Sequence, residues 1–195
     1  MAAHEERAVA DRPPAASARL IVLHAGYVGP RTASTVTFVS DGDHRIVIDP
    51  GMVATASLIL DPLREAGCEP GRVTDVVLSH HHPDHTMNAG LFPGARVHDV
   101  WAVYQGDRWE DRDAEGVLLT PSVRLIRTPG HTPQDITTLV GTADGIVACT
   151  HVWWAAGGPA SDPRATDPHA LERSRERVLA VADLVVPGHG AAYRP

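Results

Sequence analysis

A dense group of histidines lies within residues 79–86, which read Ser-His-His-His-Pro-Asp-His-Thr. In a turn that follows a strand, His80 and His82 can point at one position, while Asp84 and His85 can point at a neighbouring position. Imidazoles and carboxylates without thiolates are ligands that suit zinc, and also iron or manganese. The segment therefore predicts a metal site. The plainer alternative is a run of surface histidines in which the aspartate only caps a following helix.

Three further histidines stand in similar settings at the ends of predicted strands. They are His131, His151 and His189. Two of them have a glycine neighbour, which allows the backbone to turn sharply and to approach a site closely. A single histidine in such a place is commonly structural, but their shared position after strands makes all three candidate metal ligands.

The elements that would position these side chains are short apolar runs separated by turns that contain glycine. The β-branched run 73–79 leads directly into His80. Helices are predicted at 54–66 and from the Asp167-Pro168 cap to about residue 181, with the charged side chains of the second helix facing solvent. The segment 107–115 is predicted to be an acidic loop. The predicted strands are 19–24, 35–39, 45–49, 73–79, 96–99, 123–127, 136–140, 146–149 and 184–186.

The chain has 195 residues, of which 43% are hydrophobic and 21% charged, and this composition is typical of a globular domain with a core. Residues 1–18 are rich in alanine, proline and charge without periodicity, which predicts a mobile N-terminal tail. Residues 19–195 are predicted to form a single α/β domain. Within this domain, residues 153–168 are predicted to form a mobile loop. The Trp153-Trp154 pair of this loop is expected either to form an apolar wall of the site or to pack in the core.

Composition excludes several classes of function. All 17 basic residues are arginine, which excludes Schiff-base chemistry and a P-loop lysine. The formal net charge of −7 opposes binding along nucleic acid. Cys68 and Cys149 cannot make a disulfide framework, and the first residues lack the pattern of a secretory signal. No apolar run is long enough for a membrane span. We therefore expect a cytoplasmic protein whose partner is a small-molecule substrate.

The order of these motifs resembles that of the metallo-β-lactamase superfamily over nearly the whole chain. The H-x-H-x-D-H motif, a turn at 48–51 and glycine-histidine segments at 128–131 and 187–190 follow the family order. Residues 88–94 and 171–175 resemble the glyoxalase-II-like group within this superfamily. The resemblance implies an αββα sandwich of four layers, in which two mixed β-sheets are flanked by helices and the metals lie where loops converge.

The resemblance also implies two neighbouring metal sites with three protein ligands each. The ligands of the first metal would be His80, His82 and His131. The ligands of the second metal would be Asp84, His85 and His189. Asp49 would support a ligand or the loop by hydrogen bonds. Asp84 would in addition be catalytic, because it would orient the nucleophile and accept its proton.

The chain departs from the family pattern at one position. Where the family usually has a glycine followed by an aspartate that bridges both metals, this chain has Thr150-His151. A neutral imidazole cannot bridge two metals as a carboxylate does. His151 is therefore expected either to be a terminal ligand of one metal or to face away from the site, and the second metal is expected to bind more weakly.

We expect a zinc-dependent hydrolase with up to two metals per chain, iron and manganese being the alternative metals. In such an enzyme a metal-bound hydroxide attacks an ester, thioester or related small-molecule bond. A phosphodiesterase or ribonuclease on the same site is one alternative, because a relative in the glyoxalase-II-like group is assigned a ribonuclease role. A second alternative is a mononuclear iron oxygenase of the persulfide type, whose metal site requires a carboxylate at the position of His151. A third alternative is a non-catalytic binding module with an impaired metal site.

Overall fold

The computed structural model describes residues 2–195, and its strands form two mixed β-sheets. The first sheet contains, in order, β1 (Arg19–His24), β2 (Val36–Asp41), β3 (His44–Ile48), β4 (Asp75–Val77), β5 (Arg96–His98), β6 (Ala102–Gln105) and β7 (Arg108–Asp111). The second contains, in order, β12 (Leu184–Pro187), β11 (Gly145–Thr150), β10 (Ile136–Thr142), β9 (Val123–Arg127) and β8 (Leu118–Thr120). Neighbouring strands are antiparallel except β3–β4, β4–β5 and β11–β12, which are parallel.

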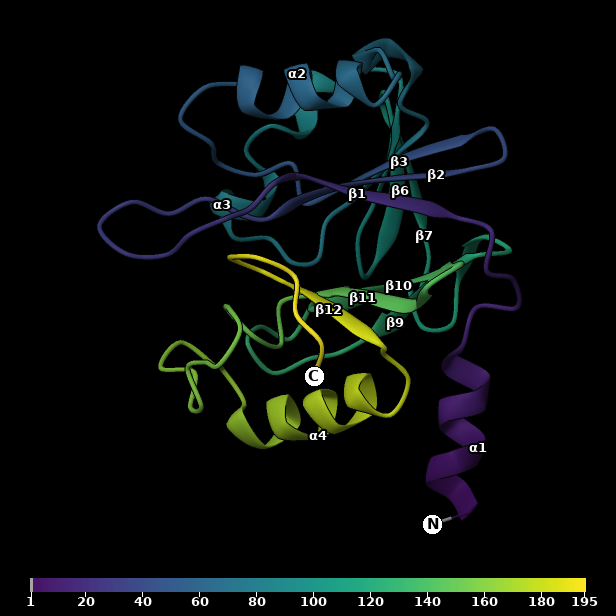
Figure 1. Ribbon diagram of the computed structural model, residues 1–195, viewed down its shortest axis with the longest axis vertical. Helices are drawn as coiled ribbons and strands as arrows, with labels where there is room; N and C mark the ends of the chain where they lie inside the picture. The colour runs from purple at the N-terminus through teal and green to yellow at the C-terminus, as the bar shows by residue number, and fades with distance from the viewer. Residues whose placement is uncertain (1) are drawn as a thin grey trace.

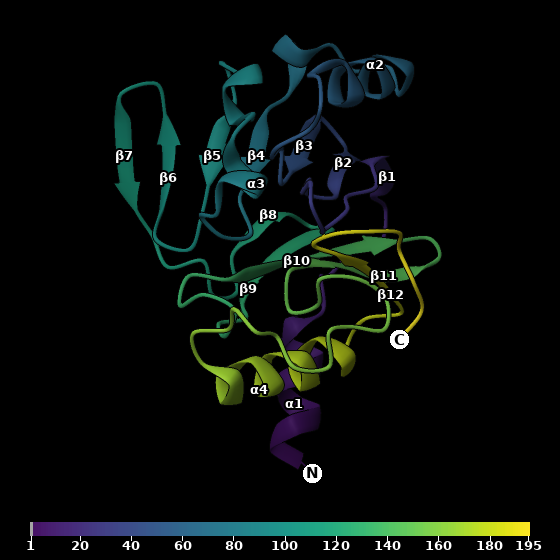
Figure 2. The same cartoon turned by 90° about the vertical axis from the view of Figure 1, so that its left-hand side faces the viewer.

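The helices complete four layers. Helix α2 (Ser57–Glu65) covers the outer face of the first sheet, and α4 (Pro168–Leu179) covers the outer face of the second (Figures 1 and 2). The remaining helical elements are α1 (Ala2–Asp11), α3 (Pro83–Thr86), η1 (Pro70–Arg72) and η2 (Ala89–Leu91). The αββα sandwich expected from the resemblance is confirmed. Among the described residues, no helix is long and apolar enough to cross a membrane.

The main core lies between the two sheets, and each outer face has an apolar layer beneath its helix. Successive residues of a strand point to opposite faces. In β11, Val147 and Cys149 therefore point into the core between the sheets, whereas Ile146 and Ala148 point towards α4. Because both faces are covered, these strands are continuous apolar runs, which is why the sequence reveals them.

The carboxyl ends of β3, β4, β9, β11 and β12 lie along one edge of the sandwich. β3 and β4 are parallel, β11 and β12 are parallel, and β9 runs in the direction of β11 because both are antiparallel to β10. The segments that follow these five ends carry Asp49, the 79–86 motif, His131, His151 and His189. The topology therefore brings the candidate residues together at the carboxyl ends of strands, which is where α/β sheets bind their ligands.

Within the segment 1–18, which we predicted to be a mobile tail, residues 2–11 form the helix α1. At its end, Asp11 is buried and accepts hydrogen bonds from Nε and Nη2 of Arg177, both at 2.7 Å. Burial opposes the charge of this guanidinium, but the hydrogen bonds and charges of Asp11 and Glu115 raise the pKa of Arg177. The prediction that all charged side chains of α4 face solvent is therefore wrong for Arg177, and also for the buried Arg175.

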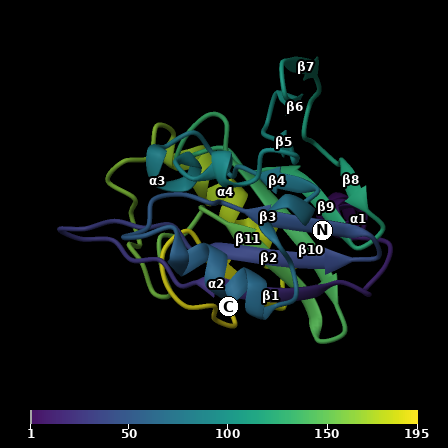
Figure 3. The ribbon, with the colours of Figure 1, turned by 90° about the horizontal axis from the view of Figure 1, so that it is seen from above.

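The acidic segment 107–115 is also not a loop throughout. Its residues Arg108–Asp111 form β7, which pairs with β6 as a hairpin at the end of the first sheet, away from the rest of the sandwich (Figure 3). Every residue of β7 is exposed. Backbone pairing rather than side-chain burial makes this strand, so the sequence carries no apolar pattern for it.

Asp75 at the start of β4 is expected to be a large contributor to stability. Its fully buried carboxylate accepts hydrogen bonds from Thr74 (2.7 Å) and His98 (2.8 Å) and pairs with Arg96 (2.7 Å). Burial opposes ionisation, yet the hydrogen bonds of His98 and Thr74 and the charges of His98 and Arg96 hold the pKa of Asp75 far below its usual range. Asp75→Ala should lower the free energy of unfolding by about 3–5 kcal/mol, because it leaves buried partners unpaired.

Urea denaturation measures this loss of unfolding free energy. The matched control is Asp43→Ala, at an exposed position of the turn between β2 and β3. It should change the free energy of unfolding by no more than about 0.5 kcal/mol. Because the folded-state pKa of Asp75 is lowered, its contribution is present above the unfolded value of about 3.9 and is lost as the pH falls further. Equal effects of the two variants would contradict this role of Asp75.

Candidate metal centre

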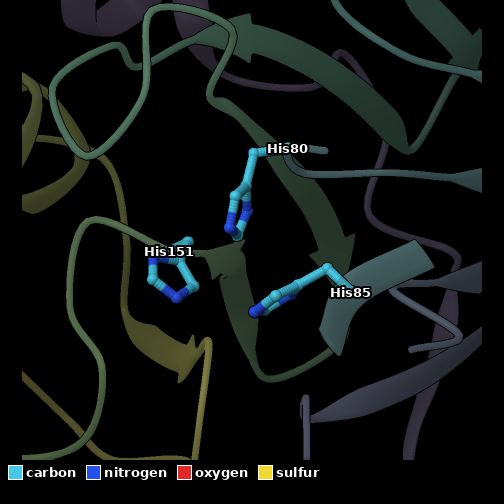
Figure 4. Close-up of side chains that lie close together, drawn as sticks. All are labelled: His80, His85 and His151. Atoms are coloured by element: carbon cyan, nitrogen blue, oxygen red, sulfur yellow. The ribbon is translucent and has the colours of Figure 1, made fainter. Parts of the chain in front are cut away.

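The seven side chains that the sequence suggested as metal ligands all meet at the edge described above. Their ligand atoms form three groups, and within each group these atoms lie within 4.8 Å of one another. The first group is His80, His82 and His131, and the second is Asp84, His85 and His189. The third is His80, His85 and His151, whose imidazoles turn towards one another in Figure 4. The first two groups are the ligand sets that the resemblance implied.

The first group has the spacing of a metal site. His82 Nδ1 lies 3.0 Å from His80 Nε2 and 3.1 Å from His131 Nε2. Ligand nitrogens around a tetrahedral zinc ion are roughly 3.3 Å apart, as bond lengths of about 2.05 Å require. Three nitrogens from two different strand ends, one in each sheet, therefore converge at a separation close to the one that zinc imposes.

Four imidazoles are oriented by hydrogen bonds on the side that faces away from the centre. The acceptors are the Ser79 hydroxyl for His80 (3.1 Å), Asp49 for His85 (2.8 Å), Asp162 for His131 (2.7 Å) and the Ala33 carbonyl for His189 (2.8 Å). The Ser79 hydroxyl gives its own hydrogen to Asp49, so it accepts from His80. In each imidazole the inner nitrogen then carries a lone pair. Lone pairs that face one another repel unless a cation lies between them, so this donor set fits a metal.

Burial disfavours the charged form of four imidazoles of the centre. Desolvation is the largest cause that lowers the pKa of His80, His131, His151 and His189. Two ring nitrogens at the centre, His85 Nε2 and His151 Nδ1, are buried without a hydrogen-bond partner in the described part of the chain. A buried nitrogen without a partner is costly, and for His85 Nε2 a metal ion would satisfy it.

Asp49 supports the motif by hydrogen bonds, as the family resemblance implied. Its Oδ1 accepts from the backbone N–H of Ser79 (2.7 Å), and its Oδ2 accepts from the Ser79 hydroxyl (2.7 Å) and from His85 Nδ1 (2.8 Å). Asp49 itself has a φ of 51°, in the left-handed region that few non-glycine residues adopt. At Gly51 a Cβ atom would lie 1.6 Å from the backbone oxygen of Asp84, so only glycine lets the two segments meet.

His151 faces the centre and does not turn away from it. Its ring centroid lies 4.4, 4.7, 4.3 and 5.2 Å from those of His80, His85, His131 and His189. Its Nε2 is 3.3 Å from His189 Nε2. Gly188 leaves space for the ring, because a Cβ there would lie 2.2 Å from His151 Cδ2. The imidazole therefore occupies the space between the first two ligand groups.

Comparison with known proteins identifies the family. A family description, Metallo-beta-lactamase superfamily, matches residues 29–108. Metallo-beta-lactamase domain-containing protein 1 of Xenopus laevis is 32% identical over 168 residues, which are 82% of this chain and 72% of that protein. The chain belongs to the metallo-β-lactamase superfamily. The human protein of the same name is 40% identical over 159 residues, which are 76% of this chain and 59% of that protein. The chain thus spans about 59% of the length of this human relative.

Solved structures support the same fold. A crystal structure of a putative metallo-beta-lactamase from Thermotoga maritima has a TM-score of 0.71 at 22% identity, and the similarity covers 92% of this chain and 100% of that one. The relatives described above confirm the sequence resemblance to the metallo-β-lactamase superfamily, and this crystal structure supports the fold. It places this chain's αββα sandwich, with its edge of histidines, among metallo-β-lactamase folds.

A cavity of about 280 Å³ opens at the candidate metal centre, along the edge of this metallo-β-lactamase fold. The candidate ligands that line it are His82, Asp84, His131, His151 and His189. The other lining residues are Val28, Thr32, Met52, Pro83, Trp154 and Arg164. Its volume is at the lower end for sites that hold small molecules, so the cavity can place a small ligand directly against the candidate metal ligands.

Sequence reasoning missed Asp162 and Arg164, both in the loop after β11. Asp162 accepts from the outer nitrogen of His131, and Arg164 lines the cavity. A signal was present, because these are the only acidic and the only basic residue between 153 and 166. Of the two tryptophans, Trp154 lines the cavity, whereas Trp153 packs against the layer beneath α4.

Proposed function

We propose that this member of the superfamily is a metal-dependent hydrolase of small acyl compounds, with zinc or iron as its metal. One observation carries the proposal: four imidazoles, oriented by acceptors on their outer sides, present lone pairs within two neighbouring ligand groups, and two of them, His131 and His189, line a cavity. A metal bound by such ligands supplies a Lewis acid and lowers the pKa of a water to about 7. His80, His82 and His131 would hold one ion, and Asp84, His85 and His189 would hold another.

Asp84 has the position of a proton acceptor. Its Oδ2 lies 3.5 Å from both His85 Nε2 and His189 Nε2, and its side chain lines the cavity. In the described part of the chain, no donor forms a hydrogen bond with its other oxygen, Oδ1. This oxygen can accept a hydrogen bond from a water in the cavity, orient that water towards a carbonyl carbon and receive its proton.

Named relatives support hydrolysis of an acyl bond. A protein named hydroxyacylglutathione hydrolase, from Albidiferax ferrireducens, is 26% identical over 133 residues, which are 65% of this chain and 50% of that protein. A dizinc quorum-quenching lactonase shares the fold with a TM-score of 0.62 at 17% identity, over 80% of this chain and 72% of that one. The apolar side chains at the cavity and the net charge of −7 favour an acyl compound over a phosphodiester polymer. The buried free thiols of Cys68 and Cys149 support the further proposal of a cytoplasmic location.

The proposal is tested by metal analysis and by turnover. Protein purified without chelator is expected to contain zinc or iron by elemental mass spectrometry, and to hydrolyse members of a panel of thioesters, lactones and aryl esters. Asp84→Asn keeps the shape of the side chain but removes the proton acceptor, so kcat should fall about 10²–10⁴-fold. Wild-type kcat in Asp84→Asn would contradict the role of this residue. Hydrolysis of phosphodiesters alone would replace the acyl compounds as substrates.

A further inference from the structure

A second cavity lies at the edge of the first sheet that is opposite the candidate metal centre. Its volume is about 610 Å³, within the range of small-molecule sites. It is lined by residues at or beside the amino ends of β3, β4 and β5, among them Arg45, Thr74 and Arg96. These three strands are parallel, so their carboxyl ends point to the metal edge, and in Figure 1 the turn between β2 and β3 lies on the side opposite α3. The cavity is therefore a site separate from the metal centre.

Three arginines line this second cavity, namely Arg45 of β3, Arg72 of η1 and Arg96 of β5. Arg72 is exposed, and no carboxylate or carbonyl among the described residues pairs with its guanidinium. Arg45 donates from Nη1 to two nearby backbone carbonyls (2.7 and 2.8 Å), and its Nη2 and Nε have no partner in the described part of the chain. Arg96 pairs with Asp75 through Nη2 (2.7 Å), yet its side chain is 43% exposed. Each guanidinium thus has donors that a ligand can use.

The lining has an excess of positive charge, although the whole chain has a formal net charge of −7. Among the described residues that line the cavity, Asp43 is the only acidic one against the three arginines. The thiol of Cys68 reports the same field. Burial raises the pKa of this thiol, whereas the charges of Arg45 and Arg72 oppose the rise. Both guanidinium groups therefore act on one part of the cavity, where they favour an anion over a cation.

The rest of the wall is polar and has little side-chain bulk. Gly67, Gly71 and Gly94 line the cavity, and a Cβ atom at any of the three would meet nothing within 4 Å. Among the described lining residues Val73 is the only aliphatic one, and none is aromatic. The cavity at the metal centre differs, because Trp154 and other apolar side chains line it. The second cavity therefore suits a hydrophilic ligand without an aryl or acyl body.

We propose that this second cavity binds a small soluble polyanion, a compound that carries a phosphate or diphosphate group. Guanidinium groups suit this role because their planar donors match phosphate oxygens with paired hydrogen bonds. Oxygens of one ligand can contact Arg45 and Arg72 together, with Arg96 beside them. A compact ligand is favoured over nucleic acid, because the arginines surround a concave site and the net charge of −7 opposes binding along a polymer. The site goes beyond the proposed hydrolase function and does not depend on it.

Calorimetry with inorganic pyrophosphate tests the proposal. The wild type should bind the probe, and Arg72→Gln and Arg45→Gln should each weaken this binding at least about tenfold, because each removes charge-assisted hydrogen bonds. Arg19→Gln is the matched control. Arg19 is exposed at the amino end of β1, which runs in the direction of β3, so it lies at the same edge of the sheet without lining the cavity. This variant should keep the wild-type Kd.

Arginine labelling with phenylglyoxal gives a second readout, which locates the bound probe. Pyrophosphate should protect Arg72 from the reagent, as measured by peptide mass spectrometry, and should leave Arg19 reactive. Labelling of Arg72 at the same rate with and without pyrophosphate, or equal affinity of wild type and both cavity variants, would overturn the inference. Arg72-dependent binding of a short single-stranded oligonucleotide without binding of pyrophosphate would also overturn it, because the ligand would then be a polymer. Neither result would change the expectation of hydrolysis at the metal centre.

Discussion

His82→Ala is expected to yield a folded protein that has lost the metal of the first ligand group and at least about 10³-fold in kcat/KM. His82 Nδ1 is the atom that both His80 Nε2 and His131 Nε2 approach, so its removal opens the group. The lost Lewis acid corresponds to several kcal/mol of transition-state stabilisation. His82 is less buried than His80, which is 1% exposed, so truncation of His82 should be tolerated better.

Elemental mass spectrometry, circular dichroism and turnover of the preferred ester measure these effects together. His81→Ala is the matched control, because its imidazole neighbours the motif but pairs with Asp99 at 3.0 Å, outside the ligand groups. It should keep the metal content of the wild type. Wild-type metal content and activity in a folded His82→Ala protein would show that the first ligand group does not hold the catalytic metal.

His151→Asp is expected to increase the affinity for a second metal ion at least tenfold. The imidazole lies between the two ligand groups and adds no negative charge, whereas a carboxylate at this position could contact both ions. The attraction between two opposite unit charges about 4 Å apart is about 4 kcal/mol at an effective dielectric constant of 20, and this attraction would strengthen binding of the ion. The wild type should accordingly bind its second ion more weakly than its first.

Native mass spectrometry and zinc titration against a competing chelator give the number of ions and each affinity. His151→Asn separates charge from shape, because it has the size of aspartate and no negative charge. The asparagine variant should not gain affinity for the second ion. An unchanged second-ion affinity in His151→Asp would mean that this residue does not stand in the bridging position of the superfamily.

Several elements could be predicted from the sequence because local pattern determines them. The strands Arg19–His24 and Val123–Arg127 lie where the apolar runs predict them, and Asp167 caps α4 with a hydrogen bond from Ala170. β7 and α1 were not predictable in this way. The exposed residues of β7 depend on backbone pairing with β6, and the end of α1 depends on a distant arginine, Arg177.

The sequence by itself determined the types of the candidate ligands, their order and an α/β domain, because ligand spacing within 80–85 and apolar runs are local features. The αββα sandwich was implied by the resemblance of these motifs to the superfamily. Only the tertiary structure decided which way His151 faces, that Asp162 orients His131, and that Arg164 reaches the cavity. These contacts join residues that are far apart along the chain. Their geometry depends on how two sheets and a loop pack together, and no periodicity in the sequence encodes it.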